Sequence, residues 1–284
     1  MGYIDLHVHS TYSDGTYTPE ELILLAKKAN LVAISLTDHD TISGIESAIL
    51  AGEKYQIQVI PGIELSAKYK DKDIHILGYQ IDYKSSSLHK KLMEYEAVRE
   101  RRNEKIIDCL NKIGFSITVE DIRKRFPIGT ITRLHIAKYL VECGYVKSLQ
   151  EVFQKYLGDN GCCYVAKQGI SLEDAIGCIL EYGGYPVLAH PMRYKLEKKQ
   201  LEDLIVKCKS YGLVGIETMY SMNTTYEEEQ TRQLANKYQL FITGGSDFHG
   251  QNKPQIHLGI GKGNLKVPST LLSYLGISKK DIKK

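Results

Sequence analysis

Histidine and carboxylate residues recur in this sequence at spacings that suit metal binding. His7 and His9 alternate with apolar residues, so both imidazoles share one face if the run from Tyr3 forms a strand. Asp247 and His249 repeat this spacing after an apolar run much later in the chain. Two such side chains on one strand face can reach the same ion. Both segments are therefore predicted to supply metal ligands.

The same residue types follow the other apolar runs. The residues collected in this way are His7, His9, Asp14, Asp38, His39, Asp40, Glu64, His75, His190, Asp247 and His249. Imidazole and carboxylate ligands without thiolates suit Zn, Mn or Fe and leave positions for water and substrate, and this many ligands implies more than one ion. We leave Asp38 and Asp40 out of the ligand set. Either can instead fix the tautomer of His39, and Asp40 can cap a helix.

Alternating strand and helix patterns are expected to bring these residues together. Residues 31–36 form a continuous apolar run, typical of a buried parallel strand, and polar residues follow it directly. Strands are expected over residues 3–9, 31–36, 58–60, 74–79, 185–190, 215–217 and 240–243, and helices from residue 18 and over 44–56, 171–182, 201–211 and 225–238. Because the carboxyl ends of parallel strands face one mouth, the polar residues should converge there.

The middle of the chain follows a different pattern. Residues 98–167 lack clear strand signals and are interpreted as a helical insertion that separates a first barrel part, 1–97, from a second, 168–284. A long, charged helical pattern leads into it from Leu88 to Lys112. Shorter helices are expected over residues 119–125, 134–143 and 149–156. The sequence thus predicts an α/β fold, either a barrel or an open sheet of parallel strands, with an inserted small helical domain.

Composition limits the class of protein. In 284 residues, 43% are hydrophobic and 25% charged, which is ordinary for a globular domain and excludes a disordered or fibrous chain. No apolar run approaches the ~18 residues of a membrane span and no signal peptide is recognisable, so we expect a cytoplasmic protein without a membrane partner. A net charge of +3 offers little of the basic track that long nucleic acid needs, although twenty tyrosines leave stacking on short oligonucleotides open.

The cysteines show no metal-binding or disulfide pattern. Their positions, 109, 143, 162, 163, 178 and 208, contain no C-x-x-C spacing. We therefore expect reduced and mostly buried thiols. The terminal lysines 279, 280, 283 and 284 are expected to form a solvated tail.

Taken together, the motifs resemble those of the PHP (polymerase and histidinol phosphatase) superfamily. The segments that carry the resemblance are Asp5-Leu6-His7-Val8-His9-Ser10-Thr11-Tyr12-Ser13-Asp14-Gly15, Thr37-Asp38-His39-Asp40, Pro61-Gly62-Ile63-Glu64, His75-Ile76-Leu77-Gly78, Ala189-His190-Pro191 and Gly245-Ser246-Asp247-Phe248-His249-Gly250. The resemblance covers nearly the whole chain. It implies a distorted seven-stranded (β/α) barrel with a trinuclear metal site.

The resemblance also implies a ligand set for each ion. It assigns His7, His9, Glu64 and Asp247 to the first ion, with Glu64 bridging to the second. The second ion is completed by His75 and His190, and the third is held by Asp14, His39 and His249. Two or three divalent ions per chain, Mn, Fe or Zn, are therefore expected.

Within that superfamily, the insertion resembles bacterial phosphoesterases that remove the 3′-phosphate from nucleoside 3′,5′-bisphosphates. Some relatives of those enzymes degrade short RNAs. The similarity lies in Thr132-Arg133-Leu134-His135, Phe153-Gln154-Lys155-Tyr156-Leu157 and Tyr164-Val165, although the family usually has Gly-Arg-Pro-His in the first of these. It implies that Arg133 and His135 contact substrate phosphate. Alternatively, Arg133 lies on a solvated helix face and His135 packs at the insertion boundary.

The function expected from this resemblance is metal-dependent hydrolysis of a phosphate monoester. The favoured substrate is a nucleoside 3′,5′-bisphosphate, which would give nucleoside 5′-monophosphate and phosphate. His190, besides ligating metal, is the candidate donor of the leaving-group proton. Alternatives are an exoribonuclease acting on short RNA, a histidinol-phosphate phosphatase, or a non-catalytic structural module. No obligatory protein partner is indicated.

Overall fold

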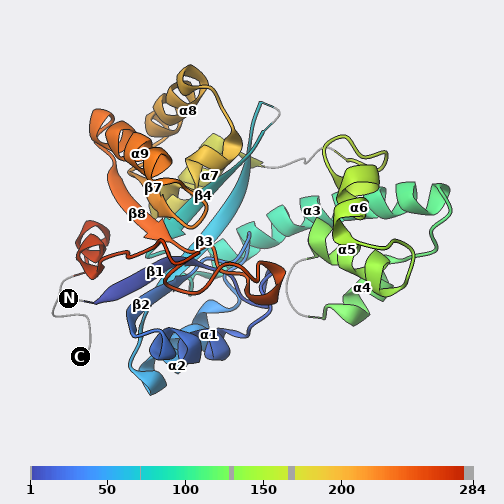
Figure 1. The fold of residues 1–284 in the computed structure, drawn as a ribbon, viewed down its shortest axis with the longest axis horizontal. Helices are drawn as coiled ribbons and strands as arrows, with labels where there is room; N and C mark the ends of the chain where they lie inside the picture. Colours follow the sequence, from blue (N-terminus) through green and yellow to red (C-terminus); the bar gives the residue numbers. More distant parts are fainter. Residues whose placement is uncertain (1, 71, 128–130, 166–169, 278–284) are drawn as a thin grey trace.

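The computed structural model describes residues 2–70, 72–127, 131–165 and 170–277. Its centre is a nearly closed barrel whose strands follow the order β1-β2-β3-β4-β6-β7-β8 (Figure 1). These strands are β1 (Tyr3–Val8), β2 (Leu31–Leu36), β3 (Gln58–Tyr69), β4 (Lys72–Tyr79), β6 (Tyr185–Leu188), β7 (Gly215–Tyr220) and β8 (Phe241–Gly245), and the short β5 (Ile170–Ser171) pairs with β3. A bridge between Val8 and Phe248 joins the two ends of the order. The predicted seven-stranded α/β barrel is confirmed.

Strand β4 is the exception to the parallel arrangement. It pairs antiparallel with both β3 and β6, whereas the neighbouring strands elsewhere in the barrel are parallel. The register pairs Tyr69 with Lys72, so β3 and β4 form a tight hairpin. The expectation that every ligand follows the carboxyl end of a strand is therefore wrong for His75. Because β4 runs backwards, its amino-terminal half reaches the mouth of the barrel.

Strand β3 is also longer than predicted. It continues past Pro61 to Tyr69, because its pairing partner changes there from β2 to β4. Pro61 is the last residue paired with β2, and Gly62 is the first residue paired with β4. Glu64 consequently lies within a strand and is held by backbone pairing on a rigid element.

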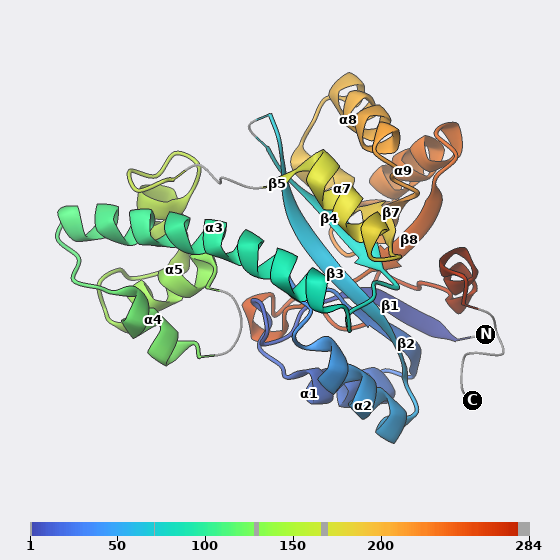
Figure 2. The same ribbon diagram turned by 180° about the vertical axis from the view of Figure 1, so that it is seen from behind.

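Helices cover the outside of the barrel. They are α1 (Pro19–Lys28), α2 (Ile45–Tyr55), α7 (Leu172–Glu181), α8 (Lys198–Ser210) and α9 (Thr225–Lys237). Helix α7 lies over β3 and β4, α9 packs on β7 and β8, and α8 contacts α7 (Figure 2). Helix α1 begins where the sequence predicts, because Thr18 and Glu21 form a reciprocal capping box. Its apolar side, with Leu22, Ile23 and Ala26, is fully buried.

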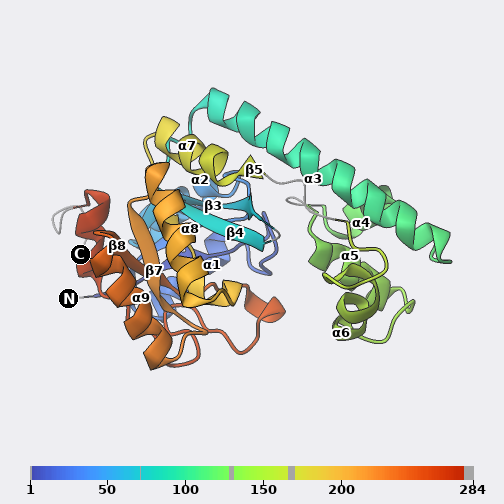
Figure 3. The ribbon, with the colours of Figure 1, turned by 90° about the horizontal axis from the view of Figure 1, so that it is seen from above.

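The helical insertion projects from the barrel on one long helix. Helix α3 (Ser86–Lys112) begins beside the barrel, and α4 (Val119–Arg125), α5 (Arg133–Glu142) and α6 (Leu149–Val152) gather along its far half (Figure 3). A π-helical turn, Phe153–Leu157, continues α6. This part has its own core, which includes Ile106, Leu110 and Ile136. The predicted boundary between residues 97 and 98 falls within α3.

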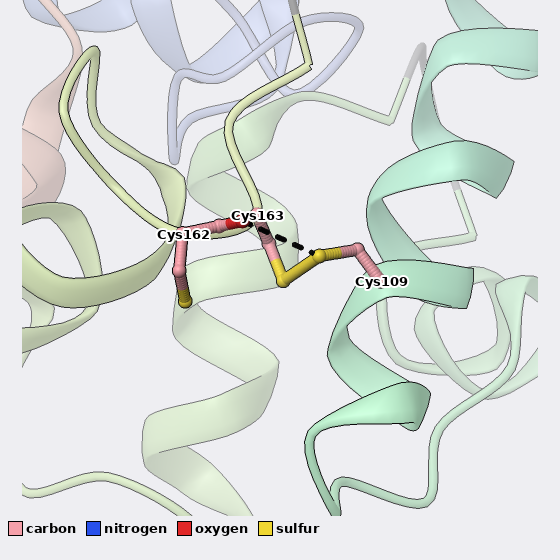
Figure 4. Close-up of a disulfide and its surroundings, with 3 residues drawn as sticks. All are labelled: Cys109, Cys162 and Cys163. Carbon is pink, nitrogen blue, oxygen red and sulfur yellow. Dashed lines mark hydrogen bonds between the residues drawn. A yellow bond between two sulfur atoms is a disulfide. The ribbon is translucent and has the colours of Figure 1, made fainter.

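The prediction of six reduced, mostly buried thiols is wrong in part. Cys109 on α3 forms a disulfide with Cys163 across a Cα–Cα distance of 5.5 Å (Figure 4). Cys143 and Cys162 are exposed, whereas Cys178 and Cys208 are buried thiols. The bonded cysteines are 54 residues apart, and they meet because the segment after α6 folds back against α3. Spacing along the chain could not reveal this pair.

The sequence also predicted the absence of a membrane span and a solvated lysine tail at the end of the chain. In the part of the chain that the structure describes, no helix has the length and apolar character needed to cross a bilayer. The terminal lysine cluster lies outside the described residues.

Candidate metal centre

The residues predicted as metal ligands meet at one mouth of the barrel. Four groups, in each of which the candidate ligand atoms lie within 4.8 Å of one another, can each hold an ion. They are His7, His9 and Asp247; His7, Glu64 and His190; His39, Glu64 and His75; and His9, Asp14, His39 and His249. These groups contain every predicted ligand. His89 and His257 belong to none of the groups found among the described residues.

The first group joins β1 to the segment after β8. His9 Nε2 lies 3.3 Å from Asp247 Oδ1, and His7 Nε2 lies 3.6 Å from the same oxygen. The Asp247 N–H donates to the His7 carbonyl, and the His9 N–H donates to the Phe248 carbonyl. These backbone hydrogen bonds fix the separation of the two segments, so strand pairing positions the side chains.

Glu64 occupies the middle of the site and is fully buried. Its Oε1 lies 2.9 Å from His75 Nδ1 and 3.0 Å from His190 Nε2. Its Oε2 lies 3.0 Å from His39 Nδ1 and 3.3 Å from His9 Nε2. One carboxylate thus faces imidazoles on both of its oxygens, which is the geometry needed to bridge two ions.

We call one of these groups the third ligand group; its members are His9, Asp14, His39 and His249. Asp14 Oδ1 is its centre, at 3.1 Å from His249 Nε2, 3.8 Å from His9 Nδ1 and 3.9 Å from His39 Nε2. These residues lie in segments that follow β1, β2 and β8. The third ligand group is therefore held by the loops at the mouth.

The buried polar atoms of the site fit bound metal ions. Within the described part of the chain, several candidate ligand atoms are buried and have no hydrogen-bond partner: His7 Nε2, His9 Nε2, Asp14 Oδ1, His39 Nδ1, Glu64 Oε2 and His190 Nδ1. Buried polar groups in native proteins are nearly always paired, and so many together call for an explanation. Divalent cations would satisfy nitrogen and oxygen atoms alike.

The electrostatics of the metal-free site favour the deprotonated, metal-binding forms of Glu64, Asp247 and His39. In contrast, the neighbouring carboxylates, acting against burial, raise the pKa values of His7 and His9. Burial opposes ionisation of Glu64, but the neighbouring histidines, His75 first among them, outweigh it and hold the pKa of Glu64 well below its usual range. Burial likewise opposes ionisation of Asp247, and Lys253 is foremost among the groups that keep its pKa low. Burial lowers the pKa of His39 to about 3, so this imidazole is neutral and has a lone pair to donate.

Glu217 is a supporting residue that the sequence analysis missed. It is fully buried on β7, and its Oε1 accepts from His7 Nδ1 at 3.0 Å. Its Oε2 accepts from the His190 N–H at 2.8 Å. The first contact fixes the His7 tautomer that directs Nε2 into the centre. A lone carboxylate in an otherwise buried strand was the available signal.

Asp247 has two further supports that were also missed. Tyr220 donates its hydroxyl to Asp247 Oδ2 at 2.8 Å, and Lys253 Nζ lies 2.7 Å from the same oxygen. Asp247 Oδ1 is the atom that faces His7 and His9. Asp247 Oδ2 therefore receives the supporting contacts, and Oδ1 is the oxygen available to an ion.

Asp38 and Asp40 support the mouth in ways that differ from those expected. Asp38 accepts from the Ser10 N–H at 2.7 Å and from the hydroxyls of Ser10 and Ser13 at 2.6 Å. Asp40 accepts from the Ser66 N–H at 2.7 Å. It does not cap α2, whose N-cap residue is Gly44. Both aspartates brace loops that carry candidate ligands.

A pocket runs from the metal centre to the helical insertion. Its lining includes Asp14, His39 and His75 on the barrel side and Arg99, Arg102 and Arg133 on the insertion side. Of the residues predicted to contact substrate, Arg133 lines this pocket. His135 is buried instead, with its ring stacked on Phe126 at 4.7 Å and its Nδ1 accepting from the Thr132 N–H.

Comparisons with known proteins identify the family and several relatives. Residues 5–158 match the PHP domain. A 5′-3′ exoribonuclease Rnm of Escherichia coli is 35% identical over 257 residues, which cover 90% of this chain and 87% of that protein. A 3′,5′-nucleoside bisphosphate phosphatase of Chromobacterium violaceum is 34% identical, with coverage of 88% of both chains.

A solved structure shows the same architecture. An amidohydrolase from Chromobacterium violaceum, determined with bound sulfate and no metal, superposes with a TM-score of 0.82. It is 33% identical, and the match covers 90% of each chain. The likeness extends over the barrel and the insertion together.

Proposed function

This chain belongs to the PHP domain family of metal-dependent phosphoesterases, and on that premise we propose that it removes the 3′-phosphate of nucleoside 3′,5′-bisphosphates. The products would be nucleoside 5′-monophosphate and inorganic phosphate. The observation that carries the proposal is the pocket, in which candidate metal ligands face a cluster of arginines. Such a pocket offers one place for a reacting phosphate and another for a phosphate that does not react.

The chain's own residues would hold the reacting phosphate against the metal centre. The residues that would bind the ions are His7, His9, Asp14, His39, Glu64, His75, His190, Asp247 and His249. Ions bound there would acidify water and neutralise phosphoryl oxygens, the two requirements of attack on a phosphate dianion. We assign His190 a second role, in which it supplies a proton to the leaving oxygen. Its backbone N–H, bound to Glu217, keeps the ring at the mouth.

Arg102 and Arg133 would hold the second phosphate. Arg102 is buried and donates its Nε–H to the Val165 carbonyl at 2.9 Å. Its Nη2 is buried, and among the described residues it has no hydrogen-bond partner. Burial, followed by the neighbouring Arg133, lowers the pKa of Arg102. Two guanidinium groups that repel each other in one pocket are stabilised by an anion that accepts from both.

Arg133 is held in place from outside the pocket. Its Nη1 donates to the Leu157 carbonyl at 3.0 Å and lies 3.7 Å from Asp159 Oδ1. Its guanidinium lies 5.9 Å from the centre of the Tyr164 ring. These contacts support the assignment of Arg133 as a phosphate contact. The placement of His135 in the core of the insertion supports a packing role for that residue instead.

A second candidate substrate is a short RNA with a 5′-phosphate. The pocket is lined by Phe153 as well as by the arginines, so a base could stack where a phosphate is held. The exoribonuclease and bisphosphatase relatives match this chain about equally well, and therefore they do not separate the two substrates. Histidinol phosphate carries one phosphate and would leave Arg102 Nη2 without a partner.

Phosphate release from a panel of compounds tests the proposal. The panel contains adenosine 3′,5′-bisphosphate, adenosine 3′-phosphate, adenosine 5′-phosphate, histidinol phosphate and a short 5′-phosphorylated oligoribonucleotide, each with added Mn²⁺. We expect the highest kcat/KM for the bisphosphate, with adenosine 5′-phosphate as the product. A preference for the oligoribonucleotide or for histidinol phosphate would overturn the substrate, and equal rates on the bisphosphate and adenosine 3′-phosphate would refute the second-phosphate site.

A further inference from the structure

A hydrogen-bonded path joins the helical insertion to the third ligand group. Lys138 on α5 donates from Nζ to Asn252 Oδ1, and Asn252 Nδ2 donates to the backbone carbonyl of Asp14 at 2.6 Å. Asn252 belongs to a short 3₁₀ turn, Gly250–Asn252, directly after His249. One amide thus contacts a helix of the insertion on one side and the segment of Asp14 on the other.

The same turn is bound to the Asp14 segment at another point. The Gln251 N–H donates to Thr16 Oγ1 at 2.9 Å. The side chains of His249 and Asp14 face each other at 3.1 Å between these backbone contacts. The separation of two members of the third ligand group therefore depends on how this turn lies against the Asp14 loop.

A separate contact reaches the remaining loop of the group. Arg99 on α3 pairs with the carboxylate of Asp40, the residue next to His39. Both side chains are largely buried, at 13% and 8% exposure. Through Ser66, Asp40 is also tied to β3. The long helix that carries the insertion thus braces the His39 loop.

The other ligand groups are supported mainly from the barrel. His7 and His190 are oriented by Glu217 on β7. Asp247 is oriented by Tyr220 on β7 and by Lys253, which directly follows the Gly250–Asn252 turn. Within the described residues, the direct links from α3 and α5 to the mouth end at the loops of Asp14 and His39. Burial lowers the pKa of Lys138, which indicates that its ammonium group loses water where α5 meets the barrel.

We propose that the helical insertion positions the third ligand group through Lys138 and Asn252, so that metal binding at this group depends on the docking of α5 against the barrel. Lys138 and Asn252 are positioning residues. Neither is a candidate ligand, and Lys138 lies outside the lining of the substrate pocket. The inference rests on the metal centre of the proposed function but is independent of the substrate.

Equilibrium dialysis of the full chain against graded Mn²⁺, followed by metal analysis, tests this proposal without substrate. In Lys138→Met we expect one ion per chain to bind at least about tenfold more weakly, a loss typical of removing a residue that orients a ligand. The other ions should keep their affinity. The control is Lys155→Met, the same change on the same insertion at an exposed lysine that pairs with Glu151.

A second variant shows whether the effect passes through Asn252. Asn252→Asp keeps an acceptor for Lys138 but removes the donor to the Asp14 carbonyl. We expect the same ion to be weakened, and Lys138→Met in that background should add little, because the two residues form one path. If Lys138 only stabilised the fold, the losses of thermal stability in the two variants would add in the double variant. The substitutions would then affect the affinities of all ions equally.

The proposal is overturned if Lys138→Met binds Mn²⁺ as the unaltered chain does, if it loses every ion in parallel, or if the unaltered chain binds no third ion. A chain that binds three ions, loses one in Lys138→Met and yet hydrolyses no phosphoester would refute the proposed function alone. The two failures are therefore distinguishable.

Discussion

Glu217 lies beneath the metal centre and contacts two candidate ligands at once. Its carboxylate accepts from His7 Nδ1 and from the His190 N–H. The first hydrogen bond requires the proton of His7 to stay on Nδ1, and this leaves Nε2 free for an ion. The ability of His7 to bind an ion through Nε2 thus depends on Glu217, which is 210 residues away in the sequence.

Replacing this carboxylate should weaken metal binding more than it weakens the fold. In Glu217→Gln, the neutral amide holds the His7 proton less firmly, and we expect Mn²⁺ affinity to fall by about 10- to 100-fold. Equilibrium dialysis measures the loss. Glu202→Gln is the control, because Glu202 pairs with exposed Lys237 on the outer helices. Equal affinities in the two variants would show that Glu217 does not support the centre.

Arg102 offers a test of the second phosphate. In Arg102→Met, loss of a charge-assisted contact of about 1.5–3 kcal/mol should lower kcat/KM for adenosine 3′,5′-bisphosphate by roughly 10- to 100-fold. The rate on adenosine 3′-phosphate should change little, because that compound has no second phosphate. Arg125→Met, at an exposed arginine paired with Glu142, serves as the control.

Equal losses on the two nucleotides would place Arg102 at the reacting phosphate instead. The kcat/KM of the Arg133→Ala variant is measured in the same assay. If its kcat/KM for the bisphosphate stays within about twofold, which is under ~0.5 kcal/mol, Arg133 does not contact phosphate.

At the scale of elements, the disulfide ties the long helix α3 to the segment that follows the π-helical turn. Cys163 is directly followed by Tyr164 and Val165, which contact Arg133 and Arg102. The cross-link therefore fixes the segment against which both pocket arginines rest. A disulfide restricts the unfolded chain as well, and this favours the folded insertion.

Differential alkylation reports the state of each cysteine. The folded chain is treated with iodoacetamide, then denatured without reductant and treated with N-ethylmaleimide. We expect the first reagent on exposed Cys143 and Cys162 and the second on Cys178 and Cys208, whose pKa values burial raises to about 11 and about 12. Only the thiolate reacts, so these two are protected at neutral pH.

The remaining pair should carry neither label. Peptide mapping is expected to find Cys109 linked to Cys163. Recovery of alkylated Cys109 from protein purified without reductant would contradict the disulfide. Reduction before denaturation is the control, because it should release both thiols for labelling.

At the scale of the whole molecule, the candidate metal ligands come from segments at both ends of the barrel order. His7 lies on β1 and His9 directly follows it, whereas Asp247 and His249 follow β8. Without bound cations, buried carboxylates and imidazoles face one another with unsatisfied atoms. Ions that bind only the folded chain should therefore stabilise it.

Removal of metal should lower the thermal stability of the entire protein. An ion present at about 100 times its dissociation constant adds ~2.7 kcal/mol. For a chain of this length, that corresponds to a shift in Tm of roughly 5–10 °C. Calorimetry before and after dialysis against EDTA measures it, and added Mn²⁺ should restore Tm. An unchanged Tm in EDTA would argue against a tightly bound cluster.

Local patterns in the sequence predicted much of the site. The alternating pattern that begins in β1 and continues to His9 places His7 and His9 on one face, because successive residues of an extended chain point to opposite sides. Capping residues fixed the start of α1, since the hydrogen bonds of a capping box lie within four residues. The ligand residue types and the barrel followed from such short-range signals, together with the family resemblance.

Other features depended on where distant segments meet. The backward direction of β4, which brings His75 to the mouth, follows from its pairing with β3 and β6. The contacts of Glu217 with His7, of Cys109 with Cys163, and of Lys138 with Asn252 each join positions far apart in the chain. The sequence by itself thus determined which residues could bind metal. Only the tertiary structure decided what supports them, because hydrogen bonds and packing act through space, and periodicity along the chain carries no record of long-range partners.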